Sequence, residues 1–265
     1  MTPEALLQAC DEGTLWPARA SSAEQADIAA AYALALRVRE LRIRRGERPA
    51  GYKVGFTNRT IWARYGVFAP IWGTVWDGTL RTCDDGTGAV DLAHTCQPRL
   101  EPEIVFGMSA DAPVQPSLES LFDCIAWAAP GFEIVQSHCP DWKFSAAETV
   151  MDGGLHARLV VGRRTPVRAL AASSEALDAM FAKTRIRLYQ DGQLKDEGSG
   201  VNVLDGPLHA LLHFVNELQR CPGAPALRAG DVVTTGTWTD AWPIAPGQVW
   251  RAEFEGRVGA LTLRC

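Results

Sequence analysis

Glu101 and Glu103 are the residues of this 265-residue sequence whose type and spacing most directly suggest chemistry. In the stretch from Arg99 to Gly107 they alternate with apolar residues, the two-residue period of a β-strand. Both carboxylates would project from one face, roughly 6.5 Å apart along the strand. Such close like charges raise each other's pKa unless an arginine, a lysine or a divalent metal offsets them. Oxygen ligands favour Mg²⁺, Mn²⁺ or Ca²⁺ over zinc, although the spacing also fits a solvated strand face.

Pro102 separates the two glutamates and affects how their strand can pair. Proline has no N–H to donate to a neighbouring strand, so the strand is expected to be an edge or to be irregular at this point. Irregular backbone beside paired acids is more typical of a functional site than of a plain sheet.

Lys53 is a second candidate, in the sequence Gly51-Tyr-Lys-Val-Gly-Phe56. The alternation predicts a strand with Lys53 on the face opposite Tyr52 and Val54. The two flanking glycines leave room for a ligand or another backbone to come close. An exposed strand lysine is the alternative interpretation.

The composition excludes several classes of protein. The net charge is −5 at 22% charged residues, so no basic surface for nucleic acid is expected. We find no apolar run long enough to span a membrane and no signal peptide at the N-terminus. Seven cysteines without a C-x-x-C pair indicate reduced thiols in the cytoplasm rather than a disulfide framework or a zinc module.

The pattern of the chain predicts an α+β protein in two parts. Residues 1–46 are expected to form a helical segment, with one helix capped by Thr2 and a second beginning at the capping box Ser22–Gln25. Residues 47–265 are expected to form one domain whose last third is mainly β, with a type I′ turn at Asp191-Gly192.

Two intermediate segments carry further expectations. Residues 66–77 are rich in aromatic side chains and read as a loop, either a lid or a plug into the core. Ser117 is expected to cap a helix that runs towards Ala129, with Pro130-Gly131 ending it before a short strand at 132–135.

Five stretches, taken in order, resemble the fumarylacetoacetate hydrolase superfamily, and within it the 2-oxopent-4-enoate hydratase / 4-oxalocrotonate decarboxylase branch. They span nearly the whole chain: Gly51-Tyr-Lys-Val-Gly-Phe-Thr57, Glu101-Pro-Glu103, Gly131-Phe-Glu133, Asp141-Trp-Lys143, and Leu227 followed by Gly230-Asp-Val-Val-Thr-Thr-Gly-Thr237.

The resemblance implies a mixed β-roll or barrel with flanking helices, usually in homo-oligomers. It implies a Mg²⁺ or Mn²⁺ ion held by Glu101, Glu103 and Glu133. By the same resemblance Lys53 and Lys143 are the expected catalytic residues. For substrate binding, the backbone N–H of Gly236 and the hydroxyl of Thr237 could contact a substrate carboxylate.

The activity implied is that of a lyase, a hydratase that acts on a 2-hydroxyalka-2,4-dienoate in the degradation of an aromatic compound. A decarboxylase or a carbon–carbon hydrolase is the alternative, since all three reactions of a 2-oxo acid pass through an enolate that the metal stabilises. A non-catalytic partner subunit on the same fold is a third interpretation, although the proposed ligands and Lys53 are all present.

One departure from the resemblance concerns Ile71. Hydratases of the family often read Q-P-D-F-G where this chain reads Ala69-Pro-Ile-Trp-Gly73, so Ile71 stands at the position of the acid. If that acid handles a proton, another group must replace it here or the reaction differs. His156 is a candidate proton carrier, with a structural role as the alternative.

Overall fold

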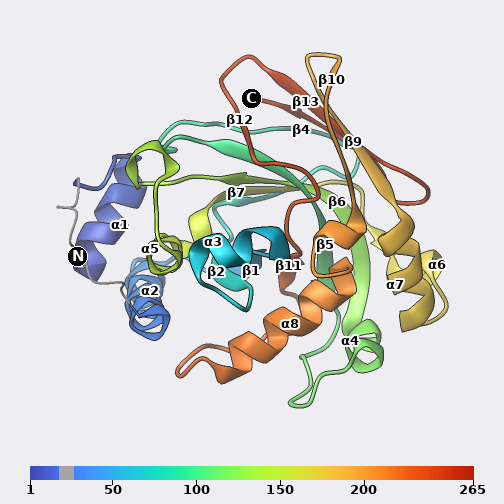
Figure 1. The fold of residues 1–265 in the computed structure, drawn as a ribbon, viewed down its shortest axis with the longest axis horizontal. Coiled ribbons are helices and arrows are strands. Elements are labelled where there is room, and N and C mark those ends of the chain that lie inside the picture. Colours follow the sequence, from blue (N-terminus) through green and yellow to red (C-terminus); the bar gives the residue numbers. More distant parts are fainter. Residues whose placement is uncertain (18–26) are drawn as a thin grey trace.

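Two β-sheets form the centre of the computed structural model, which describes residues 1–17 and 27–265 (Figure 1). The nine-stranded sheet has a main path of seven strands, in the order β2 (Ile71–Trp76), β1 (Pro49–Gly55), β11 (Val232–Thr234), β5 (Arg99–Met108), β6 (Ile125–Val135), β7 (His156–Val161) and β3 (Leu80–Thr82). Two short strands complete it: β12 (Trp242–Pro243) beside β5 and β8 (Thr165–Pro166) beside β6.

The five-stranded sheet has the order β10 (Gln193–Ser199), β9 (Arg185–Gln190), β13 (Val249–Phe254), β14 (Gly259–Arg264) and β4 (Thr87–Ala89). The turn between β9 and β10 has positive φ at Asp191 and Gly192, as a type I′ hairpin requires. The mixed α+β roll predicted from the sequence is therefore confirmed.

Helices lie to the left of, below and to the right of the sheets in the view of Figure 1. They are α1 (Pro3–Glu12), α2 (Ile28–Arg44), α3 (Trp62–Tyr65), α4 (Leu118–Cys124), α5 (Ala146–Met151), α6 (Val167–Leu170), α7 (Ser174–Lys183) and α8 (Pro207–Arg220). Short 3₁₀ turns lie at Arg59–Ile61, Pro140–Trp142, Gly153–Leu155 and Gly200–Asn202.

The alternation along β5 separates an apolar face from a polar one. Leu100, Ile104 and Phe106 are fully buried in the main core, together with Phe214 of α8 and Trp250 of the second sheet. Burial of such side chains contributes about 25 cal/mol per Å² of apolar surface, so this face supplies much of the driving force for folding. The opposite face of β5 carries Glu101 and Glu103 and, beyond them, Val105, which is buried in a separate apolar cluster.

The N-terminal helices pack on one side of this framework. Thr2 caps α1 as predicted, and Asp27 caps α2. The capping box predicted at Ser22–Gln25 lies outside the described residues. Within them, α2 begins at Ile28. Leu6 and Ala31 join Ile71 and Val150 in a separate apolar cluster. The division of the chain at residue 46 stays a prediction.

The predicted loop at 66–77 is wrong over half of its length. Ile71–Trp76 forms β2, which pairs antiparallel with β1, while Phe68 before it is 86% exposed. Both faces of β2 are buried, so it lacks the polar and apolar alternation by which a strand is recognised.

The predicted helix from Ser117 to Ala129 is also too long. Ser117 does cap α4, but the helix ends at Cys124, and β6 runs from Ile125 through Pro130 to Val135. The long ladder with β5 outweighs the helical propensity of the alanines in this segment.

Pro102 lies at an interruption in the sheet rather than at its edge. On one side, β6 pairs with β5 along its length. On the other side, β12 pairs with β5 only as far as Leu100, and β11 pairs with it only from Val105 onwards. Between them, the carbonyl of Pro102 accepts a hydrogen bond from the backbone N–H of Trp238. The expected irregularity is confirmed, and the missing N–H costs no ladder bond.

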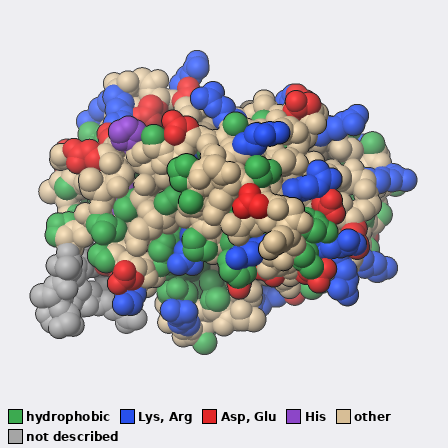
Figure 2. All heavy atoms as spheres, turned by 90° about the horizontal axis from the view of Figure 1, so that it is seen from above, with side chains coloured by type: hydrophobic (Ala, Val, Ile, Leu, Met, Phe, Trp, Pro, Cys, Tyr) green, Lys and Arg blue, Asp and Glu red, His purple; other side chains and the backbone are tan. Residues whose placement is uncertain are grey.

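Surface and thiol features complete the description. Figure 2 shows basic and acidic side chains interspersed over one face of the molecule. No disulfide joins the seven cysteines within the described residues. In the same part of the chain, none of the helices combines the length and the apolar character that crossing a membrane requires.

Candidate active site

The register of two central strands brings three glutamates together. Glu101 of β5 lies directly opposite Glu133 of β6, and Glu103 follows two residues along on the same face. Like charges directly opposite in an antiparallel pair are destabilising, so this arrangement needs a compensating cation. One carboxylate oxygen from each of the three residues lies within 4.8 Å of the others.

The three carboxylates fit a divalent cation. Glu103 and Glu133 are fully buried, and Glu103 Oε1 and Glu133 Oε2 have no hydrogen-bond partner. Two oxygens on one ion lie at most about 4.2 Å apart for Mg²⁺ and about 5 Å for Ca²⁺. The three carboxylates, whose oxygens lie within 4.8 Å of one another, would therefore have to draw closer together to hold Mg²⁺.

Lys53 is the positive charge that the structure places beside these acids. Its side chain is 4% exposed, and its Nζ lies 3.4 Å from Glu133 Oε2 and donates to the carbonyl of Gly154 at 2.7 Å. The exposed alternative is therefore wrong and the expected close approach of another backbone is confirmed, while the catalytic role of Lys53 stays a prediction. Close backbone explains one flanking glycine, since a Cβ on Gly51 would lie 1.9 Å from the carbonyl oxygen of Val232.

Charge and burial shift the pKa values of all four groups. Burial raises the pKa of Glu101, Glu103 and Glu133, the last to about 7 despite the opposing effect of Lys53. Burial alone would lower the pKa of Lys53, but the three carboxylates outweigh it and the pKa is raised. Lys53 is therefore an ammonium, and with three ionised glutamates the cluster would carry a charge of −2.

His156 lies behind Glu133, and the sequence did not predict this contact. Its Nδ1 is 2.9 Å from Glu133 Oε1, and its Nε2 is 2.9 Å from the hydroxyl of Thr79. Burial, followed by the charge of Lys53, holds the pKa of His156 well below its usual range, so the ring is neutral. An ionised Glu133 then requires Nδ1 to carry the proton and donate it.

Gly236 and Thr237 lie beside the cluster but are engaged within the protein. The N–H of Gly236 donates to Glu103 Oε2 at 2.5 Å. The hydroxyl of Thr237 donates to the carbonyl of Thr239 at 3.0 Å. Gly236 has φ +97°, and a Cβ there would lie 1.8 Å from Thr57 Oγ1. The contacts give Gly236 a role in orienting Glu103, and substrate binding by either residue stays a prediction.

Lys143 is not part of the buried cluster. Its side chain is 82% exposed and pairs with Asp141 at 3.5 Å. It borders an open pocket of about 780 Å³ together with Tyr65 and Phe144. Its predicted catalytic role would require the segment around Lys143 to move.

Ile71 is a neighbour of Lys53. Ile71 Cγ1 and Lys53 Nζ lie 3.3 and 3.4 Å from the point that a Cβ on Gly55 would occupy. Ile71 is 3% exposed. An apolar side chain therefore borders the ammonium at the position where the resemblance leads one to expect an acid.

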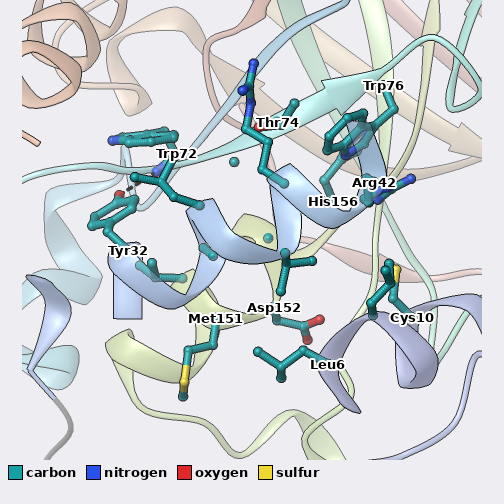
Figure 3. Close-up of a pocket in the computed structure, with 18 residues that line it drawn as sticks. Leu6, Cys10, Tyr32, Arg42, Trp72, Thr74, Trp76, Met151, Asp152 and His156 are labelled. Carbon is teal, nitrogen blue, oxygen red and sulfur yellow. Dashed lines mark hydrogen bonds between the residues drawn. The ribbon is translucent and has the colours of Figure 1, made fainter. Parts of the chain in front are cut away.

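A separate cavity of about 70 Å³ lies between α1, α2, β2 and the turn after α5 (Figure 3). Leu6, Tyr32, Trp72 and Met151 supply part of its wall. His156 lines this cavity and also contacts Glu133, so it separates the cavity from the carboxylates.

Comparison with known proteins assigns the family. The sequence pattern of the family described as fumarylacetoacetate (FAA) hydrolase C-terminal matches residues 83–264. A 2-keto-4-pentenoate hydratase of Paraburkholderia phymatum is 30% identical over 252 residues, covering 95% of this chain and 86% of the relative. The chain therefore belongs to the fumarylacetoacetate hydrolase family.

Two further similarities concern 4-oxalocrotonate decarboxylases. One from Pseudomonas sp. is 30% identical over 223 residues, covering 83% of this chain and 80% of the relative. The solved structure of another, from Pseudomonas putida G7 in complex with magnesium and adipate, superposes with a TM-score of 0.87 at 23% identity, covering 99% and 95% of the two chains. This second similarity establishes the shared fold.

Proposed function

We propose that this protein is a divalent-metal-dependent lyase, a hydratase of a 2-hydroxyalka-2,4-dienoate in the breakdown of an aromatic compound. The observation that carries the proposal is the convergence of Glu101 and the buried Glu103 and Glu133 on one face of the sheet. Two of their oxygens accept no hydrogen bond, and Lys53 lies beside them. The hydratase relatives support the substrate class.

Mg²⁺ is the proposed ion, with Mn²⁺ as the alternative. The three glutamates would hold it, and their charge of −3 together with Lys53 leaves −2 for a divalent cation to neutralise. The ion would supply Lewis-acid stabilisation of the negative charge that develops on a 2-oxo acid. Solved structures of the family with magnesium, calcium or manganese support this class of ion.

Lys53 is the proposed proton carrier. Its ammonium is fixed by Gly154 O and by Glu133, so its proton is held at a defined position on the polar face of the sheet. His156 orients the Glu133 carboxylate from behind, and the N–H of Gly236 orients that of Glu103. Lys143 and Thr237 are proposed to contact the substrate only if their segments close over the site.

The test is a turnover assay with and without Mg²⁺. It follows the ultraviolet absorbance of freshly generated 2-hydroxypenta-2,4-dienoate, alongside 4-oxalocrotonate and an acylpyruvate. We expect metal-dependent loss of the dienoate that is absent in Glu103→Gln. Activity on only one of the other substrates would replace the hydratase assignment. Metal binding without turnover of any of them would mean that the proposed substrate class is wrong.

Decarboxylation is the second candidate, and Ile71 favours it. No carboxyl group stands at this position beside Lys53, and a reaction that expels CO₂ needs no water to be activated there. Comparison of Ile71→Asp with Ile71→Asn separates the two candidates. If hydration needs that acid, the aspartate alone should raise the ratio of dienoate hydration to 4-oxalocrotonate decarboxylation.

We further propose a homo-oligomer that resides in the cytoplasm. The family resemblance supports the first expectation, and the absence of a C-x-x-C pair or a disulfide framework in the cysteine spacing supports the second. Size-exclusion chromatography with light scattering would test the assembly, and a single-chain mass would contradict it.

A further inference from the structure

We propose that the buried pair Asp152 and His138 is a positioning device for Lys53, acting through the double-glycine turn Gly153-Gly154. The inference deepens the proposed function, on which its kinetic consequences rest. Its structural consequence, the placement and protection of the Lys53 ammonium, can be tested whatever reaction the protein catalyses.

Lys53 is held in place by a contact with the double-glycine turn. Its ammonium donates to the carbonyl of Gly154 at 2.7 Å, shorter than its 3.4 Å contact with Glu133. A Cβ on Gly154 would lie 3.0 Å from Lys53 Cδ, so the turn also lies along the lysine's aliphatic chain. The position of the turn therefore determines the position of the ammonium.

The turn has a backbone conformation that depends on its two glycines. Gly153 and Gly154 have φ of +63° and +71°, which residues with a side chain rarely adopt. The turn packs directly against β2, because a Cβ on Gly73 would lie 1.8 Å from the carbonyl oxygen of Gly153. Two successive glycines make this segment intrinsically adaptable, so its placement needs an anchor.

Asp152 supplies that anchor through both of its carboxylate oxygens. Oδ2 accepts from the backbone N–H of His138 at 2.9 Å, and Oδ1 lies 2.5 Å from His138 Nδ1. The two side chains are 5% and 1% exposed. Burial of a carboxylate is costly unless it is hydrogen-bonded, and this one is satisfied by a single residue.

His138 links the pair to the strand that carries Glu133. His138 follows β6, the strand that ends at Val135 and carries Glu133. The pair therefore connects the turn that holds Lys53 to the strand that holds its acidic partner. On the outer side, the Trp16 ring stacks on the His138 ring at 5.9 Å, and the backbone N–H of Trp16 donates to the carbonyl of His138 at 2.7 Å. The N-terminal segment thus braces the pair.

The lysine content of the chain allows a direct test. The four lysines are Lys53, Lys143, Lys183 and Lys195. Acetylation by a water-soluble succinimidyl ester, followed by peptide mass spectrometry, would report each separately. In the unaltered protein we expect Lys53 to be protected and the exposed Lys143 to react, which provides an internal standard.

Asp152→Asn should raise the acetylation rate of Lys53 relative to Lys143 by roughly 10-fold, the factor that corresponds to losing one hydrogen bond to a charged group. His138→Asn is the milder variant, since it keeps the backbone N–H that Asp152 accepts, and a smaller increase is expected. It preserves the test if Asp152→Asn does not fold. Asp178→Asn is the matched control, because Asp178 lies 3.4 Å from His209 in another Asp–His pair on α7 and α8.

Kinetics provide the second readout. Asp152→Asn should lower kcat by roughly 10-fold with little change in KM. In a Lys53→Met background the same substitution should have no further effect on kcat, because it acts through the lysine. An equal loss in both backgrounds would overturn the proposal and assign the pair a purely structural role.

Protection of Lys53 that persists in both Asp152→Asn and His138→Asn would also overturn it. If the unaltered protein turns over no 2-oxo acid, the proposed function fails, but the acetylation result still decides whether the pair positions Lys53. The two failures are therefore distinguishable.

Discussion

His156 and Lys53 lie on opposite sides of the Glu133 carboxylate, one 2.9 Å from Oε1 and the other 3.4 Å from Oε2. The neutral imidazole can donate one hydrogen bond, while the ammonium supplies a full charge. Glu133 is thus oriented by one neighbour and neutralised by the other, and the two contributions can be separated by mutation.

His156→Phe should weaken Mn²⁺ binding by about 10- to 100-fold, because the ring fills the space but no longer donates to Glu133. Isothermal titration calorimetry measures the affinity directly. His213→Gln on α8 is the control and should bind Mn²⁺ as the unaltered protein does. Unchanged affinity in His156→Phe would show that Glu133 does not depend on this hydrogen bond.

Glu103→Gln should have opposite effects on metal binding and on metal-free stability. Removing a ligand should weaken binding by more than about 100-fold. Removing one buried negative charge should leave the metal-free protein as stable as before or more stable, by about 1 kcal/mol or more. Urea denaturation with a chelator present measures the stability. A clear loss of metal-free stability would mean that Glu103 is held favourably without an ion.

The metal-free protein should lose stability as the pH rises from about 5 to about 8. A glutamate in the unfolded chain titrates near 4.3, whereas burial raises the pKa of Glu133 to about 7. Between these values Glu133 holds a proton in the folded state that the unfolded chain has released, so this group weakens folding as the pH rises, and the raised pKa values of Glu101 and Glu103 act in the same direction. The lowered pKa of His156 acts in the opposite direction, and the three glutamates are expected to outweigh it. Thermal unfolding across this range tests the slope.

Saturating Mn²⁺ should reverse that slope, since the ion binds the ionised carboxylates. Glu133→Gln should flatten the metal-free profile. A profile of the metal-free protein that rises with pH would contradict the proposed protonation of Glu133.

Gly236→Ala should lower the free energy of unfolding by more than the about 1–3 kcal/mol that a strained backbone conformation alone costs. It should also weaken metal binding. The φ of +97° strains any side chain, and the new Cβ would meet Thr57 Oγ1 at 1.8 Å and displace the N–H from Glu103. Gly230→Ala is the matched control, with φ +91° and nothing within 4 Å of its Cβ. Equal losses in the two variants would mean that strain alone accounts for the effect.

Lys53→Met and Lys143→Met should differ in kind. We expect the buried Lys53 to affect kcat by about 100-fold or more, as a positioned acid–base group does. We expect the exposed Lys143 to act mainly on KM, as a charge that attracts an anionic substrate does. Steady-state kinetics of both variants decide this. A matching loss of kcat in Lys143→Met would show that its segment closes over the site.

The sequence predicted the polar face of the site because alternation is a local property. Glu101 and Glu103 share a face through the pleat of a single strand, and Lys53 follows the same rule in β1. Glu133 was placed only by the family resemblance. Its position opposite Glu101 depends on the register between β5 and β6, and only residues 132–135 of β6 were predicted as a strand.

The contacts around the site were beyond sequence reasoning for a similar reason. His156 reaches Glu133 from β7, and Thr57 meets Gly236 from a distant part of the chain. Neither pair has a fixed spacing in sequence. The segment at 71–76 was missed because a strand buried on both faces carries no periodic signal.

The opposition of Glu101 and Glu133 also bears on how the chain reaches this fold. A slip of one residue between β5 and β6 would turn the glutamates of one strand into the apolar core. The correct alignment instead brings two carboxylates face to face, which repel each other until a cation arrives. A divalent ion would therefore favour the correct register between β5 and β6. Refolding should be faster when the ion is present from the start.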